Sequence, residues 1–286
     1  MEAELAVHDH LDERQFAIAV RRLADSLNYG TDASPFLGAG IEYVQSRLYV
    51  PGDPVKSIDW RVTARTGKVH VKEYEAPKRM PIYLLLDTSA SMCVTSQRIS
   101  KYAWAVQIAG GIALAALARI SPVGLVGCGE RDLNVRPTLS RYRVFQWLHK
   151  LRRFRLNEQT NLGRRLRELA SVVENRSLII VLSDLHDPEA LSALKPLAHG
   201  HDCVVLQFQD PAEKGRMGGG IFRAEEAETG DAFIAHGRSR WFYDDFIDNE
   251  LKRAGIDHLV LQTNKAFLPK LRGFLRKRDC LGRGTR

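Results

Sequence analysis

The chain contains few cysteines, and none of them lie close together in the sequence. Only four occur among 286 residues, at Cys93, Cys128, Cys203 and Cys280, and they form no C-x-x-C pair. This spacing predicts free thiols in a reducing compartment and argues against a disulfide framework or a zinc site built on paired cysteines. We therefore expect a cytoplasmic protein.

Long hydrophobic runs are also absent. The longest weakly polar stretch, residues 102–118, is rich in alanine and is interrupted by Gln107 and by Gly110-Gly111. A membrane-spanning helix needs about 20 strongly apolar residues, so this stretch predicts a buried helix and no membrane span. The first twelve residues are rich in acidic side chains and contain no apolar segment, so we expect no signal peptide.

Several catalytic and nucleotide-binding motifs are missing. There is no phosphate-binding loop of the G-x-x-x-x-G-K type, no G-x-S-x-G elbow and no H-E-x-x-H zinc motif. The run Gly38-Ala39-Gly40 lacks the third glycine of a dinucleotide-binding fingerprint. These absences argue against a P-loop nucleoside triphosphatase, a serine hydrolase of the α/β type and a zinc protease.

The charge balance is basic. The sequence holds 42 lysines and arginines against 34 aspartates and glutamates, which gives a formal net charge of +8. Such an excess favours acidic partners, namely nucleic acid, anionic lipid or an acidic protein surface, although solubility alone explains it equally well. Hydrophobic residues make up 44% of the chain, which is enough for a large core.

The hydrophobic pattern changes twice along the chain. Residues 12–28 show the spacing of an amphipathic helix, and residues 36–76 contain short β-like runs broken by turn signals. From residue 80 onward, apolar strands alternate with helices. We expect strands at 81–86, 122–127, 178–183, 203–208 and 256–261, helices at 98–118, 141–152, 162–174, 188–199 and 240–254, and short β pieces at 131–138 and 219–235.

This alternation predicts an α/β fold with a doubly wound, mostly parallel, Rossmann-like sheet, because continuous apolar strands belong in sheets that are covered on both faces. A small β-rich unit preceded by a helix is expected before it. The predicted division of the chain is an N-terminal helix (1–35), the β-rich unit (36–79), the α/β domain (80–278) and a basic tail (279–286).

Oxygen-bearing side chains stand where predicted strands end. Asp87, Ser89 and Ser91 follow one apolar strand, Asp184 follows another, and Thr160 lies in a polar loop just before a helix. In open α/β sheets, ligands collect outside the carboxyl ends of the strands, so we expect these side chains to converge. Carboxylate and hydroxyl oxygens suit Mg²⁺, and also Mn²⁺ or Ca²⁺.

Each of these residues also has an ordinary structural explanation. Asp87, Ser89 and Thr160 could cap helices, and Asp184 could be a loop acid. His186 is close in sequence, but imidazole is not a preferred Mg²⁺ ligand, so we place it at the rim of the site.

The order Asp-x-Ser-x-Ser, then Thr, then Asp resembles the metal-ion-dependent adhesion site of von Willebrand factor A domains. The resemblance implies that Ser89 and Ser91 bind Mg²⁺ directly, that Thr160 supplies a third hydroxyl, and that Asp87 and Asp184 orient the shell. Neutral hydroxyl ligands leave the ion most of its positive charge, and the open corner of its octahedron would attract a carboxylate of a partner protein.

A second block of sequence strengthens this identification. It contains Arg47-Leu48-Tyr49-Val50-Pro51-Gly52-Asp53, then Ile58-Asp59-Trp60, then Ala64-Arg65, and leads to the Asp87 loop with Met92. Together these segments resemble the bacterial domain-of-unknown-function-58 family. Cys93 departs from its pattern, because glycine is frequent at that place.

The block is interpreted first as structural. We expect Trp60 to anchor the β-rich unit to the α/β domain. We also expect Arg47 or Arg65 to pair with Asp53 or Asp59 in a buried salt-bridge network.

The resemblance implies a non-enzymatic, metal-dependent protein-binding module, an adaptor or chaperone-like protein that works with a MoxR-type AAA+ ATPase and grips an exposed Asp or Glu. One alternative is a metal-dependent phosphohydrolase, although Ser89 stands where haloacid-dehalogenase phosphatases have a second Asp. The other is a nucleic-acid binder that uses the basic surface, including residues 141–155. That stretch also has the apolar face of an ordinary amphipathic helix, so we do not expect nucleic acid to be the partner.

Overall fold

The computed structural model of the chain describes residues 2–4, 13–28, 43–74, 80–131, 133–155, 157–214, 221–225, 232–236 and 244–280. The strands are β1 (Glu2–Glu4), β2 (Tyr43–Leu48), β3 (His70–Tyr74), β4 (Ile82–Leu86), β5 (Val123–Gly127), β6 (Asn134–Thr138), β7 (Arg153–Arg155), β8 (Leu178–Ser183), β9 (Asp202–Gln209), β10 (Ile221–Glu225), β11 (Ala232–His236) and β12 (Asp257–Gln262). The helices are α1 (Glu13–Asn28), α2 (Trp60–Thr66), α3 (Lys101–Ala118), α4 (Arg141–Leu151), α5 (Leu162–Val172), α6 (Ala190–Gly200), α7 (Pro211–Lys214), α8 (Asp244–Arg253) and α9 (Leu268–Cys280), with short 3₁₀ turns at Val55–Ser57 and Ala90–Cys93.

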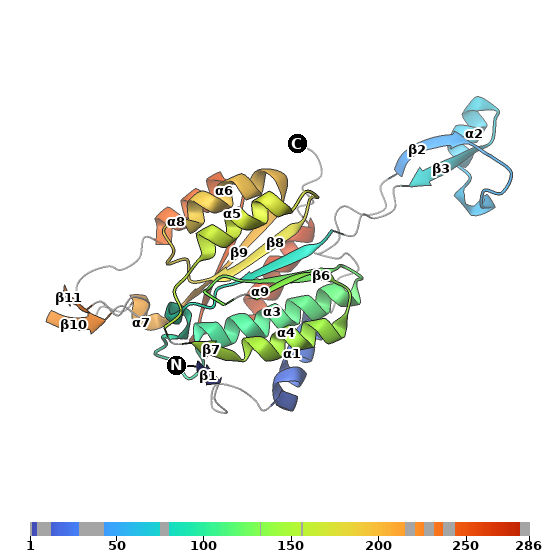
Figure 1. Cartoon of the computed structure of the whole chain (residues 1–286). Helices are drawn as coiled ribbons and strands as arrows, with labels where there is room; N and C mark the ends of the chain where they lie inside the picture. The colour runs from blue at the N-terminus through green and yellow to red at the C-terminus, as the bar shows by residue number, and fades with distance from the viewer. Residues whose placement is uncertain are drawn as a thin grey trace.

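A six-stranded sheet forms the centre of the protein, with the strand order β12-β9-β8-β4-β5-β6 (Figure 1). The first five strands of this order are parallel, and β6 at the edge runs antiparallel to β5. The structure therefore confirms a mixed α/β fold with a mostly parallel sheet, an arrangement consistent with a Rossmann-like fold. The buried runs of β4, β5 and β8 are the apolar strands that the sequence predicted.

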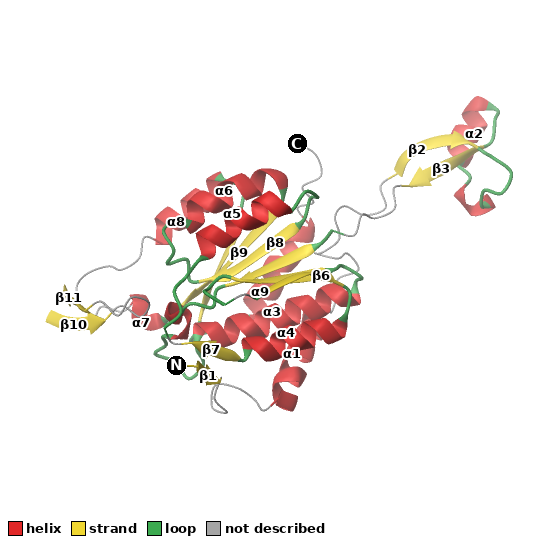
Figure 2. Ribbon diagram, viewed as in Figure 1, coloured by secondary structure: helices red, strands yellow, loops and turns green. Residues whose placement is uncertain are grey.

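Helices cover both faces of this sheet (Figure 2). One hydrophobic core joins the sheet to α1, α3, α4 and α9, and a second joins its other face to α5, α6 and α8. Alternate side chains of each strand enter opposite cores; in β8, for example, Ile180 belongs to the first and Val181 to the second.

Helix α3 is the buried helix expected from the alanine-rich stretch. Its two central glycines allow close packing, because a Cβ on Gly111 would lie 2.5 Å from the Leu23 side chain of α1, and one on Gly110 would lie 2.9 Å from Leu148 of α4. Among the described residues, α3 alone is long and apolar enough to cross a membrane, and 83% of that stretch is buried inside the protein. A helix buried in a protein core can be equally long and apolar, so this finding alone is weak evidence for a membrane span.

The strands β2 and β3 pair antiparallel, and together with α2 they form a small unit drawn apart from the central sheet in Figure 1. Only β hairpins were expected here, so α2 corrects the prediction. Asp59 explains the helix, since its side chain accepts hydrogen bonds from the backbone of Arg61 and Val62 as an N-cap. The helix ends at Gly67, whose φ of 70° is the left-handed conformation that glycine adopts without strain.

Two expectations about this unit were wrong. Trp60 is 67% exposed, so it does not anchor the unit to the α/β body. Arg47 does pair with Asp53, through two hydrogen bonds of 2.7 Å, but the pair is on the surface and not buried. The guanidinium hydrogen bond lowers the pKa of Asp53 to about 2. The pair closes the Pro51-Gly52 turn.

Several short elements complete the fold. The hairpin β10–β11 confirms the β pieces expected at 219–235, while the pairing of β1 with β7 was not anticipated. Helix α9 was also missed, because its basic residues obscured the apolar spacing of Leu271 and Leu275. These two leucines are buried in the core. The helix extends into the range predicted as a basic tail. The predicted domain boundaries themselves stay a prediction.

Candidate functional site

The expected site residues lie at the point where the order of the strands reverses. From β4 the chain continues to β5 and β6 on one side of the sheet, and it then returns through β8 to β9 and β12 on the other side. Asp87 follows β4 directly and Asp184 follows β8, which is its neighbour. The crevice between the carboxyl ends of two such strands is the usual ligand site of open α/β sheets.

Asp87 is 1% exposed, and only neutral groups donate to it within the described part of the chain. Its Oδ2 accepts from Ser183 Oγ at 2.6 Å and from Thr160 Oγ1 at 3.5 Å, and its Oδ1 accepts from the backbone N–H of Ser89 at 3.1 Å. Burial, together with the negative charge of Asp184, raises the pKa of Asp87 to about 7. Among the residues that the structure describes, no cationic side chain donates to this buried carboxylate.

The hydroxyls of the Asp87 loop connect the two carboxylates. Ser89 Oγ lies 3.0 Å from Ser91 Oγ, and Ser91 in turn hydrogen-bonds to Asp184. Ser89 begins the 3₁₀ turn Ala90–Cys93, yet its hydroxyl makes no capping hydrogen bond there. The hydroxyl is therefore directed into the site and does not serve the turn.

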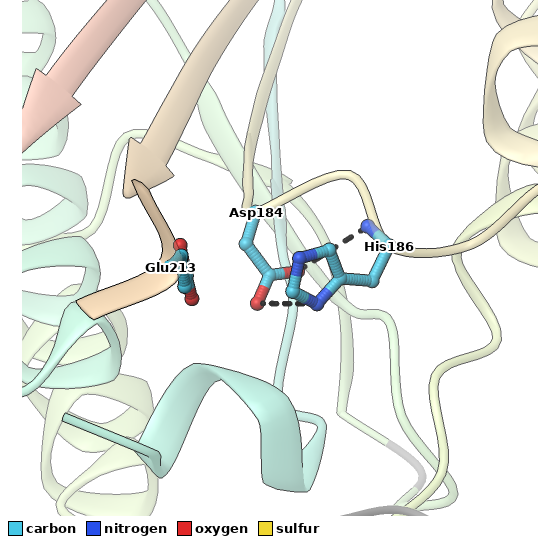
Figure 3. A group of neighbouring side chains, drawn as sticks. All are labelled: Asp184, His186 and Glu213. Carbon is cyan, nitrogen blue, oxygen red and sulfur yellow. Dashed lines mark hydrogen bonds and ion pairs between the residues drawn. The ribbon is translucent and has the colours of Figure 1, made fainter. Parts of the chain in front are cut away.

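Asp184 lies close to other ionisable side chains, of which Figure 3 shows His186 and Glu213. Its Oδ2 accepts from Lys101 Nζ at 2.8 Å and lies 3.3 Å from His186 Nδ1. Lys101 Nζ also donates to Glu213 Oε1. Burial alone would raise the pKa of Asp184, but the Lys101 ammonium and His186 outweigh it and hold that pKa below its usual range.

Asp184, His186 and Glu213 have ligand atoms within 4.8 Å of one another, so these three groups could hold a metal ion (Figure 3). The Lys101 ammonium, however, already bonds to both carboxylates of the group. A metal ion between Asp184 and Glu213 would have to displace it.

A buried glutamate holds the Thr160 loop beside the Asp87 loop. Glu158 accepts from Thr88 Oγ1 at 2.8 Å and from Arg131 Nε at 2.7 Å, and its backbone carbonyl accepts from Ala90 N at 2.7 Å. Glycine is required opposite, because a Cβ on Gly129 would lie 2.1 Å from Glu158 Oε1. These contacts bring Thr160 within reach of Asp87.

The backbone after Asp184 is strained. Leu185 has a φ of 62°, a left-handed conformation that is costly for a branched side chain. Its N–H donates to Ser183 Oγ at 2.9 Å, and Ser183 Oγ donates to Asp87. The strained turn therefore helps to fix the hydroxyl that holds Asp87.

The structure brings the five expected site residues together at one end of the sheet. A chain of hydrogen bonds and contacts runs from Thr160 to Asp87, on to Ser89 and Ser91, and then to Asp184. Their role as metal ligands stays a prediction. Lys101, Ser183, Glu158 and Glu213 were missed. For Lys101 a signal existed, since it is the only charged residue of a long helix and stands at its start.

The donor set fits a hard divalent cation. Three hydroxyls converge with a carboxylate that has no cationic partner among the described residues, and such oxygens are ligands that suit Mg²⁺. Burial and the neighbouring Asp184 carboxylate raise the pKa of Asp87, and a cation bound at these hydroxyls would lower it again.

Comparison with known proteins places the chain in a family. The family model described as "Protein of unknown function DUF58" matches residues 45–253, so the chain belongs to this family, as the sequence predicted. The uncharacterised proteins Rv1480 of Mycobacterium tuberculosis and Mb1516 of Mycobacterium bovis are each 25% identical over 222 residues, which covers 76% of this chain and 70% of the relative.

One solved structure is also similar. The crystal structure of the conserved hypothetical protein BatB from Bacteroides thetaiotaomicron matches with a TM-score of 0.44 and 16% identity, over 70% of this chain and 98% of that one.

Proposed function

We propose that the α/β body is a von Willebrand factor A-like domain with a metal-ion-dependent adhesion site, and that the protein is a metal-dependent protein-binding module. Ser89, Ser91 and Thr160 would hold a Mg²⁺ ion, with Asp87 and Asp184 behind them. When bound, the ion supplies a Lewis-acidic position for one external carboxylate.

The observation that carries this proposal is the burial of the Asp87 carboxylate among neutral hydrogen-bond donors. Its carboxylate is 1% exposed, lies next to a second buried carboxylate and receives only neutral donors among the described residues. Hydrogen bonds alone do not offset the burial, as the raised pKa shows. A divalent ion at the adjacent hydroxyls would supply the missing positive charge.

The partner that fits such a site is a protein with an exposed Asp or Glu. The ion would bind this carboxylate, and the net charge of +8 would attract an acidic surface at long range. We propose a MoxR-type AAA+ ATPase as this partner and the cytoplasm as the place of action. In this proposal the protein is an adaptor and not an enzyme.

A pull-down with and without metal tests the proposal. The protein is immobilised and offered a MoxR-type ATPase of the same organism in Mg²⁺ or in EDTA, with Ser89→Ala/Ser91→Ala as the site variant. Ser171→Ala is the control, because this serine is exposed on α5 away from the site. We expect capture only in Mg²⁺ and only by the wild type and the control.

Two outcomes would point elsewhere. Capture that survives both EDTA and Asp87→Ala refutes the metal-dependent mechanism. Turnover of p-nitrophenyl phosphate that is lost in Asp87→Asn would favour a phosphohydrolase instead, and DNA binding that is steeply salt-dependent and unaffected by EDTA would favour a nucleic-acid binder.

A further inference from the structure

Lys101 is a charged residue in an unfavourable place. It is the first residue of α3, and its side chain is 1% exposed. Burial disfavours an ammonium ion, and the N-terminus of a helix carries partial positive charge of its own. A lysine is stable here only because negative groups compensate both costs.

Two carboxylates from different elements provide this compensation. Asp184, at the end of β8, accepts from Lys101 Nζ at 2.8 Å, and Glu213 of α7 accepts from the same nitrogen. The Lys101 ammonium is therefore held between two carboxylates in the site.

The two aspartates of the site, Asp87 and Asp184, thus differ in their hydrogen-bond donors. Asp184 has Lys101 as its cation, whereas in the described part of the chain the donors to Asp87 are hydroxyls and a backbone N–H. A mobile cation entering the site meets one carboxylate that is already neutralised and one that is not. This difference arises because α3 begins next to Asp184, so that its first residue, Lys101, reaches that carboxylate.

We propose that Lys101 is a positioning residue that supplies a fixed positive charge to the site. It neutralises Asp184, so the protein cancels less of the charge of a divalent ion bound there. This inference rests on the proposed function. An ion beside Asp87 then keeps more positive charge for the carboxylate of a partner, at the cost of weaker binding of the ion. Lys101 also ties α7 to the site through Glu213.

Mn²⁺ binding by four variants tests this proposal. Lys101→Met removes the fixed charge, and we expect it to bind Mn²⁺ at least about tenfold more tightly than the wild type, because two uncompensated carboxylates then face the ion. Glu213→Gln leaves Lys101 less compensated and should bind Mn²⁺ more weakly. Lys101→Arg keeps the charge and should resemble the wild type. Free Mn²⁺ is measured by electron paramagnetic resonance, with Mg²⁺ competition as a second readout.

Lys195→Met is the matched control, because Lys195 also pairs with a glutamate, Glu250, but on the surface at α6. It should leave Mn²⁺ affinity unchanged. If Lys101→Met does not fold without metal, Glu213→Gln and Lys101→Arg still decide the question. The proposal is overturned if Glu213→Gln binds Mn²⁺ as tightly as the wild type, or if a folded Lys101→Met shows no gain.

The outcomes also separate this inference from the proposed function. If the wild type binds no Mn²⁺ but Lys101→Met does, Lys101 occupies the place of the cation and the metal-dependent function fails. If the wild type binds and Lys101→Met binds equally, the function stands and the role of Lys101 is refuted. If neither binds, both are refuted.

Discussion

Replacing Asp87 by asparagine should make the metal-free protein more stable at pH 8. In the folded protein, burial and the charge of Asp184 raise the pKa of Asp87 from 3.8 to about 7. Between these two pH values the folded protein keeps a proton that the unfolded chain has released. The contribution of Asp87 to stability is therefore highest below pH 3.8, falls as the pH rises to about 7, and stays low above it.

The size of this effect follows from the shift. Each pKa unit corresponds to about 1.4 kcal/mol, so the charged carboxylate costs the metal-free fold at most about 4 kcal/mol at pH 8. Asparagine avoids that cost but loses one acceptor for the hydroxyl and amide donors, which costs about 1–2 kcal/mol. We expect a net stabilisation of about 2 kcal/mol at pH 8 and none at pH 4.

Urea unfolding in EDTA at the two pH values measures this difference. Asp210→Asn is a control of opposite sign. Burial would raise the pKa of Asp210, but hydrogen bonds from Ser96, Ala212 and Thr95 hold it below the usual value. Its stabilising contribution is present above the unfolded pKa and is lost as the pH falls, so Asp210→Asn should destabilise the protein, and more so at pH 8.

The metal response completes the experiment. Mg²⁺ should raise the melting temperature of the wild type at pH 8 and leave that of Asp87→Asn unchanged, because the variant lacks the charge that the ion would compensate. If Asp87→Asn destabilises the metal-free protein at pH 8 as much as at pH 4, Asp87 is not a buried, uncompensated carboxylate and the reasoning about the site is wrong.

Two further predictions concern residues around the site and in the small unit. Gly129→Ala should displace Glu158, whose Oε1 would lie 2.1 Å from the new Cβ, and should abolish Mg²⁺-dependent stabilisation while the protein still unfolds cooperatively; unchanged Mg²⁺ affinity by calorimetry would contradict this. Trp60→Ala should change the free energy of unfolding by less than about 0.5 kcal/mol in urea titrations, because Trp60 is 67% exposed. A loss several times larger would restore the anchoring role.

The place of the candidate site could be predicted from the sequence, but its charge balance could not. Asp87 and Asp184 each follow an apolar strand, and parallel strands bring their carboxyl ends to one edge, so the convergence follows from the pattern. Lys101 is 83 residues from Asp184, and Glu213 is 112 residues from Lys101. No local pattern joins them, because their contact depends on where α3 and α7 begin relative to β8.

The exposure of Trp60 is a second property that the sequence could not predict. Its size suggests a core residue, and the surrounding motif identifies the family, yet neither property tells which surface the side chain faces. The small unit has few residues of its own to cover it, since Val71 and Asp59 are its buried positions among the described residues. Side-chain exposure in such a unit is decided by what packs on it.

The amino-acid sequence by itself determined the alternation of strands and helices, the family, and the end of the sheet where polar oxygens collect, because these follow from local periodicity and from the order of the elements. Tertiary structure alone decided that Lys101 is buried beside Asp184 and Glu213, and that Asp87 receives only neutral donors from the described residues. Electrostatic balance depends on distances of a few ångströms between segments far apart in the chain, and only the packed fold sets those distances.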